Sequence, residues 1–152
     1  MKALQQVVKG SLWVGVSAAA MLVAGCAARA PITLNGSQSV PPVTTNASST
    51  ADITIRPSKC PSAATGASCQ QVFGTVTTSG VMGTAAHIHL GAAGKAGPVV
   101  APLMKASDTT WMVPPNTFIS DAQYGAYADG ELYVNVHSDA NKPGEIRGQL
   151  KP

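Results

Sequence analysis

The amino-acid sequence predicts an all-β fold, a Greek-key β-sandwich with one short helix. Short apolar or β-branched runs recur along the chain with turn-forming residues between them, which is typical of sandwiches and barrels. The 152 residues include 15 Gly and 11 Pro. Only 11% of the residues are charged, and one segment alone carries a helix signal. These features exclude a helical bundle and disfavour a doubly wound α/β fold.

The first half of this fold begins at Ile32 to Leu34, where apolar and polar residues alternate as in a half-buried strand. Asn35 to Pro42 (NGSQSVPP) has turn chemistry. Ala51 to Ile55 alternates again, and the β-branched run Val72 to Thr78 (VFGTVTT) predicts a third strand.

The middle of the chain contributes two more strands, Thr84 to Leu90 (TAAHIHL) and the apolar run Val99 to Leu103. The glycine-rich segment Gly91 to Pro98 between them is expected to be a loop. It does not open a helix, so its glycines do not indicate a phosphate-binding loop.

The last third holds the only helix signal. Ser120 to Gln123 matches the S-x-x-Q capping box and predicts a short helix that ends near Gly130. Glu131 to His137 (ELYVNVH) is the clearest strand of the chain. Ser138 to Gly144 is a turn, and Glu145 to Leu150 is the final strand.

The N-terminus has the pattern of a secretory leader, residues 1–25. Lys2 and Lys9 precede the apolar run Ser11 to Ala24, which is shorter than the roughly 20 residues of a membrane-spanning helix. Leu22 to Cys26 (LVAGC) resembles the bacterial lipobox, in which cleavage precedes an acylated cysteine. The alternative is an ordinary signal peptide cut at Ala24 or at Ala28 to Ala30.

We therefore expect Cys26 to carry acyl chains such as palmitate and to anchor the protein to a membrane. Residues 26–31 are then a lipidated tether, and residues 32–152 form the domain. Ala27 follows the cysteine, where an Asp would resemble an inner-membrane retention signal. The expected location is the outer membrane, facing the periplasm, and the membrane is the one partner that the sequence indicates.

The two other cysteines, Cys60 and Cys69, lie in a segment rich in Pro, Ser, Ala and Gly. Exported proteins meet oxidising conditions, so a disulfide is expected. A metal pair is the alternative, although no histidine lies near these cysteines in the sequence.

Three histidines form the candidate metal site. In a strand, a spacing of two places His87 and His89 on one face, with Ile88 on the core side. His137 faces outward on another predicted strand by the same alternation. If the two strands are neighbours, three imidazoles converge as a partial ligand shell for copper or zinc. The alternative is three surface histidines that bind only backbone.

Other residues are weaker candidates. The methionines Met82, Met104 and Met112 offer soft ligands for Cu(I), although isolated methionines more often fill cores. Glu145 and Arg147 alternate in the last strand and are expected to form an exposed ion pair. The net charge is +3, of which two charges precede Cys26, so a nucleic-acid partner is not indicated. The sequence shows no Ser-His-Asp or Cys-His arrangement of the kind used in nucleophilic catalysis.

Three segments resemble the CHRD domain in the order of that family. They are LNGSQSVPPVTTNASSTA (34–51), AAHIHLGAAGKAGPVVAPL (85–103) and GELYVNVHSDANKPGEIRGQL (130–150). The resemblance implies an immunoglobulin-like or superoxide-dismutase-like sandwich and little about chemistry. The segment around Cys60 and Cys69 looks like an addition to the family pattern.

A more distant resemblance is to the copper-zinc superoxide dismutases. In these enzymes an H-x-H strand and a later histidine hold copper, and an arginine near the C-terminus guides the anion. His87, His89, His137 and Arg147 have similar places in the order of this chain. The bridging histidine and the zinc loop are missing, so dismutase activity is not expected. This leaves two main hypotheses: a non-enzymatic, membrane-anchored CHRD module without a cofactor, and a periplasmic copper-binding protein that uses the three histidines. The third hypothesis is a weak redox enzyme at the same three histidines.

Overall fold

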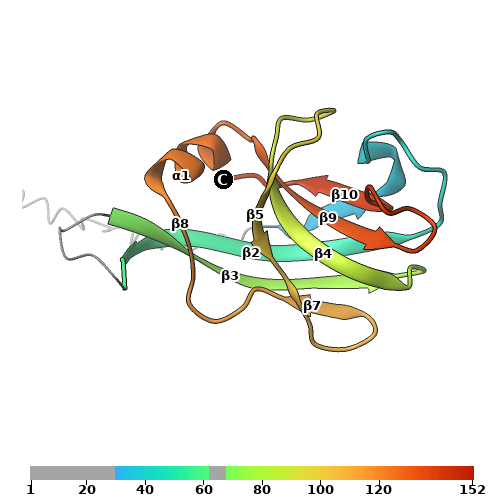
Figure 1. Ribbon diagram of the computed structural model, residues 1–152, viewed down its shortest axis with the longest axis horizontal. Coiled ribbons are helices and arrows are strands. Elements are labelled where there is room, and N and C mark those ends of the chain that lie inside the picture. The colour runs from blue at the N-terminus through green and yellow to red at the C-terminus, as the bar shows by residue number, and fades with distance from the viewer. Residues whose placement is uncertain (1–29, 62–67) are drawn as a thin grey trace, which may run out of the picture.

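The computed structural model describes residues 30–61 and 68–152, and in these residues the predicted all-β fold with one short helix is confirmed (Figure 1). The predicted leader and Cys26 lie outside the described residues. No described helix is long and apolar enough to cross a bilayer. The elements are β1 (Ile32–Asn35), a 3-10 turn η1 (Gly36–Gln38), β2 (Ser48–Lys59), β3 (Ser68–Ser79), β4 (Gly83–Leu90), β5 (Val99–Pro102), β6 (Met104–Lys105), β7 (Thr110–Met112), β8 (Thr117–Ile119), α1 (Asp121–Ala128), β9 (Leu132–Ser138) and β10 (Ile146–Gln149).

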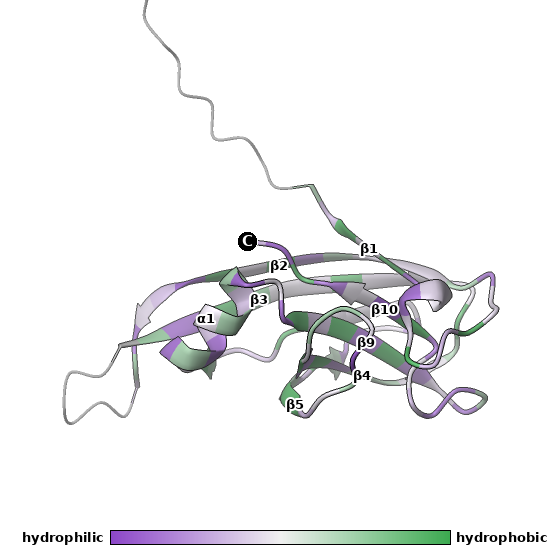
Figure 2. Cartoon of the chain, turned by 90° about the horizontal axis from the view of Figure 1, so that it is seen from above, coloured by the Kyte–Doolittle hydropathy of each residue, from purple (hydrophilic) through white to green (hydrophobic). Residues whose placement is uncertain are grey.

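All ten strands join one antiparallel sheet that folds over on itself. The order is β5-β4-β9-β10-β1-β2-β3-β7-β6, with β8 also paired to β3. The last strand, β10, lies beside β1, so the first and last strands of the described domain are neighbours in the sheet. Seen from above, β2 and β3 lie on one side and β4, β5 and β9 on the other (Figure 2). The chain passes between the two sheet edges at Leu103, whose N–H donates to Ala86.

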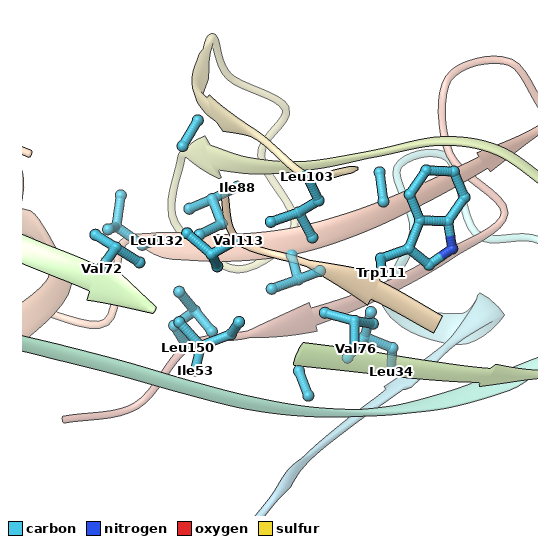
Figure 3. Packing of buried hydrophobic residues seen from close by; sticks show 14 of the residues in the cluster. Leu34, Ile53, Val72, Val76, Ile88, Leu103, Trp111, Val113, Leu132 and Leu150 are labelled. Carbon is cyan, nitrogen blue, oxygen red and sulfur yellow. The ribbon is translucent and has the colours of Figure 1, made fainter. Parts of the chain in front are cut away.

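The core fills the space between these two layers (Figure 3). Strand residues alternate between the core and the outer face, as the period of two requires. Ile88 on β4 and Val134 and Val136 on β9 are buried, while their neighbours in sequence lie on the outer face. Among the described residues, the buried core residues run from Leu34 to Leu150.

The structure has longer or additional strands where the sequence has little apolar signal. Strands β2 and β3 are each 12 residues long, because their Ser- and Thr-rich ends continue the ladder beyond the runs that we predicted. The short strands β6, β7 and β8 were not predicted. With two or three residues each, they are too short to show a period.

The single helix was predicted from its cap. Ser120 Oγ accepts a hydrogen bond from the backbone N–H of Gln123, and the Gln123 side chain accepts one from the Ser120 N–H. Tyr127 is buried in the core, and its hydroxyl donates to the Lys151 carbonyl. The helix thereby covers one end of the core beside the C-terminus.

The predicted disulfide between Cys60 and Cys69 is confirmed. It joins the end of β2 to the start of β3, across the segment that lies partly outside the described residues.

Removing this disulfide with Cys60→Ser and Cys69→Ser together is expected to lower the free energy of unfolding by about 2–3 kcal/mol. The bond closes a short loop and so reduces the entropy of the unfolded chain. Urea unfolding of the oxidised parent and the double variant measures the difference. Equal midpoints and slopes would contradict the expectation.

Candidate metal centre

The three histidines lie on two neighbouring strands. His87 and His89 project from β4 and His137 from β9, and these strands are antiparallel neighbours. In the register, His137 is opposite Ala85, while Asn135 and Tyr133 are opposite His87 and His89. The small Ala85 side chain leaves room for the His137 ring to approach His87. The convergence of the three histidines required the strands that carry them to be neighbours, and β4 and β9 are neighbours.

The three imidazoles form one compact cluster on the outer face of the sheet. One potential ligand atom from each ring lies within 4.8 Å of those of the other two. His87 Nδ1 is 3.0 Å from His137 Nε2. The ring centroids are 4.9 Å apart for His87 and His137, and 5.5 Å apart for His87 and His89. His89 is buried, and the other two rings are half-buried.

Backbone carbonyls fix the tautomers of two of these rings. His89 Nδ1 is 2.9 Å from the Gly97 carbonyl oxygen, and His137 Nδ1 is 2.8 Å from that of Lys142. A carbonyl only accepts, so both Nδ1 atoms carry the proton and donate it. The neutral rings then present Nε2 as a lone pair. This is how carbonyl partners orient histidines that bind metals.

The charged state of the cluster is disfavoured. Burial lowers the pKa of His87, and the neighbouring His137 and His89 lower it further. Burial also lowers the pKa of His89, against the hydrogen bond to Gly97, which raises it. Both rings are thus held toward the neutral form, which is the form that binds metal.

The geometry fits a transition-metal ion. Two imidazole nitrogens that bind one ion at 2.0–2.1 Å in a tetrahedral arrangement lie roughly 3.3 Å apart. In the metal-free protein His87 Nδ1 donates a hydrogen bond to His137 Nε2 at 3.0 Å, so the two atoms are close to this spacing, but the His87 proton must leave Nδ1 before both bind the ion. His89 Nε2 is buried and has no hydrogen-bond partner in the described part of the chain, although such groups are nearly always satisfied. Three imidazoles from this cluster can hold one ion and leave a further position open.

The expected exposed ion pair between Glu145 and Arg147 is wrong. Both residues are buried, and the ion pairs found among residues 30–61 and 68–152 are Lys105–Asp108 and Lys142–Asp139. Glu145 precedes β10 instead of lying within it, so the strand alternation that we assumed does not relate the two side chains. Each has neutral partners of its own.

Glu145 forms hydrogen bonds with residues from three separate positions in the chain. Its carboxylate accepts hydrogen bonds from the hydroxyls of Ser138 and Thr45, and its backbone carbonyl accepts one from Ser39. The hydrogen bond from Ser138 is the main reason that the pKa of Glu145 is below its ordinary value. The contacts join the loop before β2 to the end of β9.

The stability of the protein is expected to fall in acid partly because Glu145 becomes protonated. A carboxyl whose pKa is lowered by folding stabilises the protein above its ordinary pKa, and this contribution is lost as the pH falls through the folded-state value. Urea midpoints between pH 7 and pH 2.5 should fall less steeply in Glu145→Gln than in the parent. The exposed Glu131→Gln is the control. A parent and a Glu145→Gln variant with parallel curves would contradict the assignment.

Two of the three candidate methionines are exposed. Met82 is 89% exposed and Met104 is 45% exposed, so the expectation that isolated methionines fill the core is wrong for these two. Met112 on β7 is half-buried.

Sequence reasoning missed the residues around the cluster. Tyr133 stacks on the His89 ring, with centroids 5.0 Å apart and planes 9° apart, and Gly97 supplies the carbonyl for His89. Tyr133 and Asn135 alternate with the core residues of β9, which allows either a polar rim on the histidine face or ordinary solvent-facing residues. The structure places both on the histidine face and buries them beneath the loops after β4 and β9. The period of two gives the face of a strand, and it does not show which loops cover that face.

The comparisons with known proteins identify one family model. The model described as CHRD domain matches residues 30–150, which is most of the chain and nearly all of its described part. No curated protein and no solved structure gives a significant match.

Proposed function

The chain belongs to the CHRD domain family, and on this premise we propose that it is a lipid-anchored envelope protein that binds one copper ion at its three histidines. The function is binding, for storage, delivery or protection, and it involves no turnover. The family itself names no ligand, so the proposal depends on the site.

The observation that carries the proposal is the buried Nε2 atom of His89. It has no hydrogen-bond partner among residues 30–61 and 68–152, its ring is oriented by Gly97, and two further imidazoles adjoin it. Leaving a buried polar atom unpaired costs about 1–3 kcal/mol, which a bound ion would offset.

Copper is the favoured ion because of the donor set. Imidazole nitrogens suit copper, zinc, iron and nickel, and among divalent ions of the first row Cu²⁺ binds such sites most tightly. No carboxylate belongs to the cluster within the part of the chain that the structure describes. This excludes, for those residues, the oxygen-rich ligand sets that magnesium and calcium require.

The membrane anchor is the second part of the proposal, and the leader pattern and Cys26 in the sequence support it. In a bacterial host, Cys26→Ala is expected to move the protein from the outer-membrane fraction to the soluble periplasmic fraction. Continued partitioning of the variant with membranes would contradict lipid anchoring at this residue.

A titration tests the copper site. The protein from residue 27 to 152, which includes all buried core residues of the described part, is titrated with Cu(II), with Cu(I) under anaerobic conditions and with Zn(II). We expect one copper ion per chain and a higher melting temperature. At a free metal concentration of 100 times Kd, the expected stabilisation is about 2.7 kcal/mol. Unchanged melting curves with all three ions would leave a metal-free CHRD module.

A redox enzyme at the same cluster is the competing function. It requires superoxide or another substrate to be turned over by the copper-loaded protein, and this turnover must disappear in His137→Ala. Copper binding without turnover above that of free copper supports the binding role.

A further inference from the structure

Three planar groups are stacked in a row beneath the copper site. The guanidinium carbon of Arg147 lies 3.5 Å from the centre of the Tyr133 ring. On its other side, the Tyr133 ring is stacked on His89, with centroids 5.0 Å apart and planes 9° apart. Arg147 on β10 and Tyr133 on β9 both lie on the outer face of the sheet, where β4 carries His89. The stack links a C-terminal strand to a candidate metal ligand.

Arg147 also forms hydrogen bonds to the loop 91–98, which covers this face of the sheet. Its Nη1 donates to the Lys95 carbonyl and its Nη2 to the Ala92 carbonyl, both at 2.8 Å. Arg147 is only 2% exposed, and its partners among the described residues are neutral oxygens and an aromatic ring. A buried cation costs free energy unless hydrogen bonds satisfy it, so these contacts define one position of the loop.

The loop in turn determines the orientation of His89. Gly97 donates its N–H to the Tyr133 hydroxyl at 3.1 Å and accepts from His89 Nδ1 through its carbonyl. Tyr133 therefore contacts the arginine, the loop and the histidine at once. Displacement of the loop would remove the acceptor that keeps the His89 proton on Nδ1 and its Nε2 free.

We propose that Arg147 is a positioning residue of the metal centre, which holds the loop 91–98 on Tyr133 so that His89 presents Nε2 to the ion. This role rests on the proposed copper function. Its effect on the tautomer of His89, however, can be measured in the metal-free protein. Lysine cannot replace this arginine, because one ammonium lacks the planar fork that reaches two carbonyls and stacks on a ring.

The test measures the His89 tautomer and the Cu(II) affinity in the same proteins, residues 27–152. Long-range ¹H–¹⁵N NMR on metal-free protein reports which ring nitrogen of His89 carries the proton. The variants are Arg147→Lys, Arg147→Met and Tyr133→Phe. The matched control is Arg56→Met, since Arg56 also lies over an aromatic ring, that of Phe73 at 4.4 Å, on a part of the sheet remote from the cluster.

In the parent and in Arg56→Met, we expect a single Nδ1-protonated tautomer of His89. In the two Arg147 variants, a mixture of tautomers and a Cu(II) affinity lower by about 10–100-fold are expected, the range for residues that orient metal ligands. Tyr133→Phe should show a smaller loss, because it keeps the stack and removes only the hydroxyl. If Arg147→Met does not fold, Arg147→Lys and Tyr133→Phe decide the question.

A parental tautomer together with Cu(II) affinity within twofold of the parent in Arg147→Lys would overturn the proposal. A mixed tautomer in a protein whose parent binds no metal would contradict the copper function and leave the positioning role standing. The two proposals can therefore fail separately.

Discussion

Replacing both His87 and His89 by alanine is expected to lower the Cu(II) affinity by at least about 100-fold. Residues that merely orient metal ligands already contribute about 10–100-fold, and this variant removes two of the three nitrogen donors. The stabilisation by copper should disappear with the affinity, because it depends on the ratio of free metal to Kd. Competition titration and melting curves with and without copper measure both effects.

The control for this variant is Thr50→Ala, which alters an exposed residue of β2, a strand that does not pair with β4 or β9. Its Cu(II) affinity should equal that of the parent. Undiminished copper binding in the double histidine variant would show that the ion binds elsewhere, and the assignment of the centre would be wrong.

Gly97→Ala is expected to destabilise the protein by roughly 3 kcal/mol and to weaken copper binding at the same time. A Cβ at this position would lie 1.6 Å from the Leu90 carbonyl oxygen, which is backbone and cannot rotate away. The loop must therefore shift, and with it the carbonyl that accepts the His89 proton. Urea unfolding of the metal-free protein and a Cu(II) titration of the same sample measure the two losses.

Gly94→Ala in the same loop is the matched control. A Cβ there would meet nothing within 4 Å, although the positive φ of +74° makes alanine unfavourable. The expected cost is about 1 kcal/mol, with the copper affinity close to that of the parent. If the two glycine variants behave alike, close packing of Gly97 on β4 is not what holds the His89 carbonyl partner.

Much of the fold follows from local patterns in the sequence. The alternation around Ile88, Val134 and Val136 gave the buried faces of β4 and β9, and the capping box at Ser120 gave the helix. The convergence of the histidines followed from spacing alone, provided that β4 and β9 paired. These elements depend on neighbours in the sequence, so their signals are readable without the fold.

The surroundings of the site depend instead on contacts between distant segments. Arg147 is 52 and 55 residues from the two loop carbonyls that it binds. The residue pattern of its own strand, β10, does not indicate these contacts. Glu145 accepts from Thr45, which is 100 residues away in the sequence. The ion pair that we expected between the two was a local inference, and burial beneath the loops overrode it.

The most direct test of the copper centre is the position of the ion itself. Crystals of the copper-loaded protein, measured at the copper absorption edge, should give one anomalous peak between β4 and β9. We expect nitrogen atoms of His87, His89 and His137 at about 2.0–2.1 Å from that peak. A peak elsewhere on the protein, or none at a metal concentration that saturates the titration, would contradict the account.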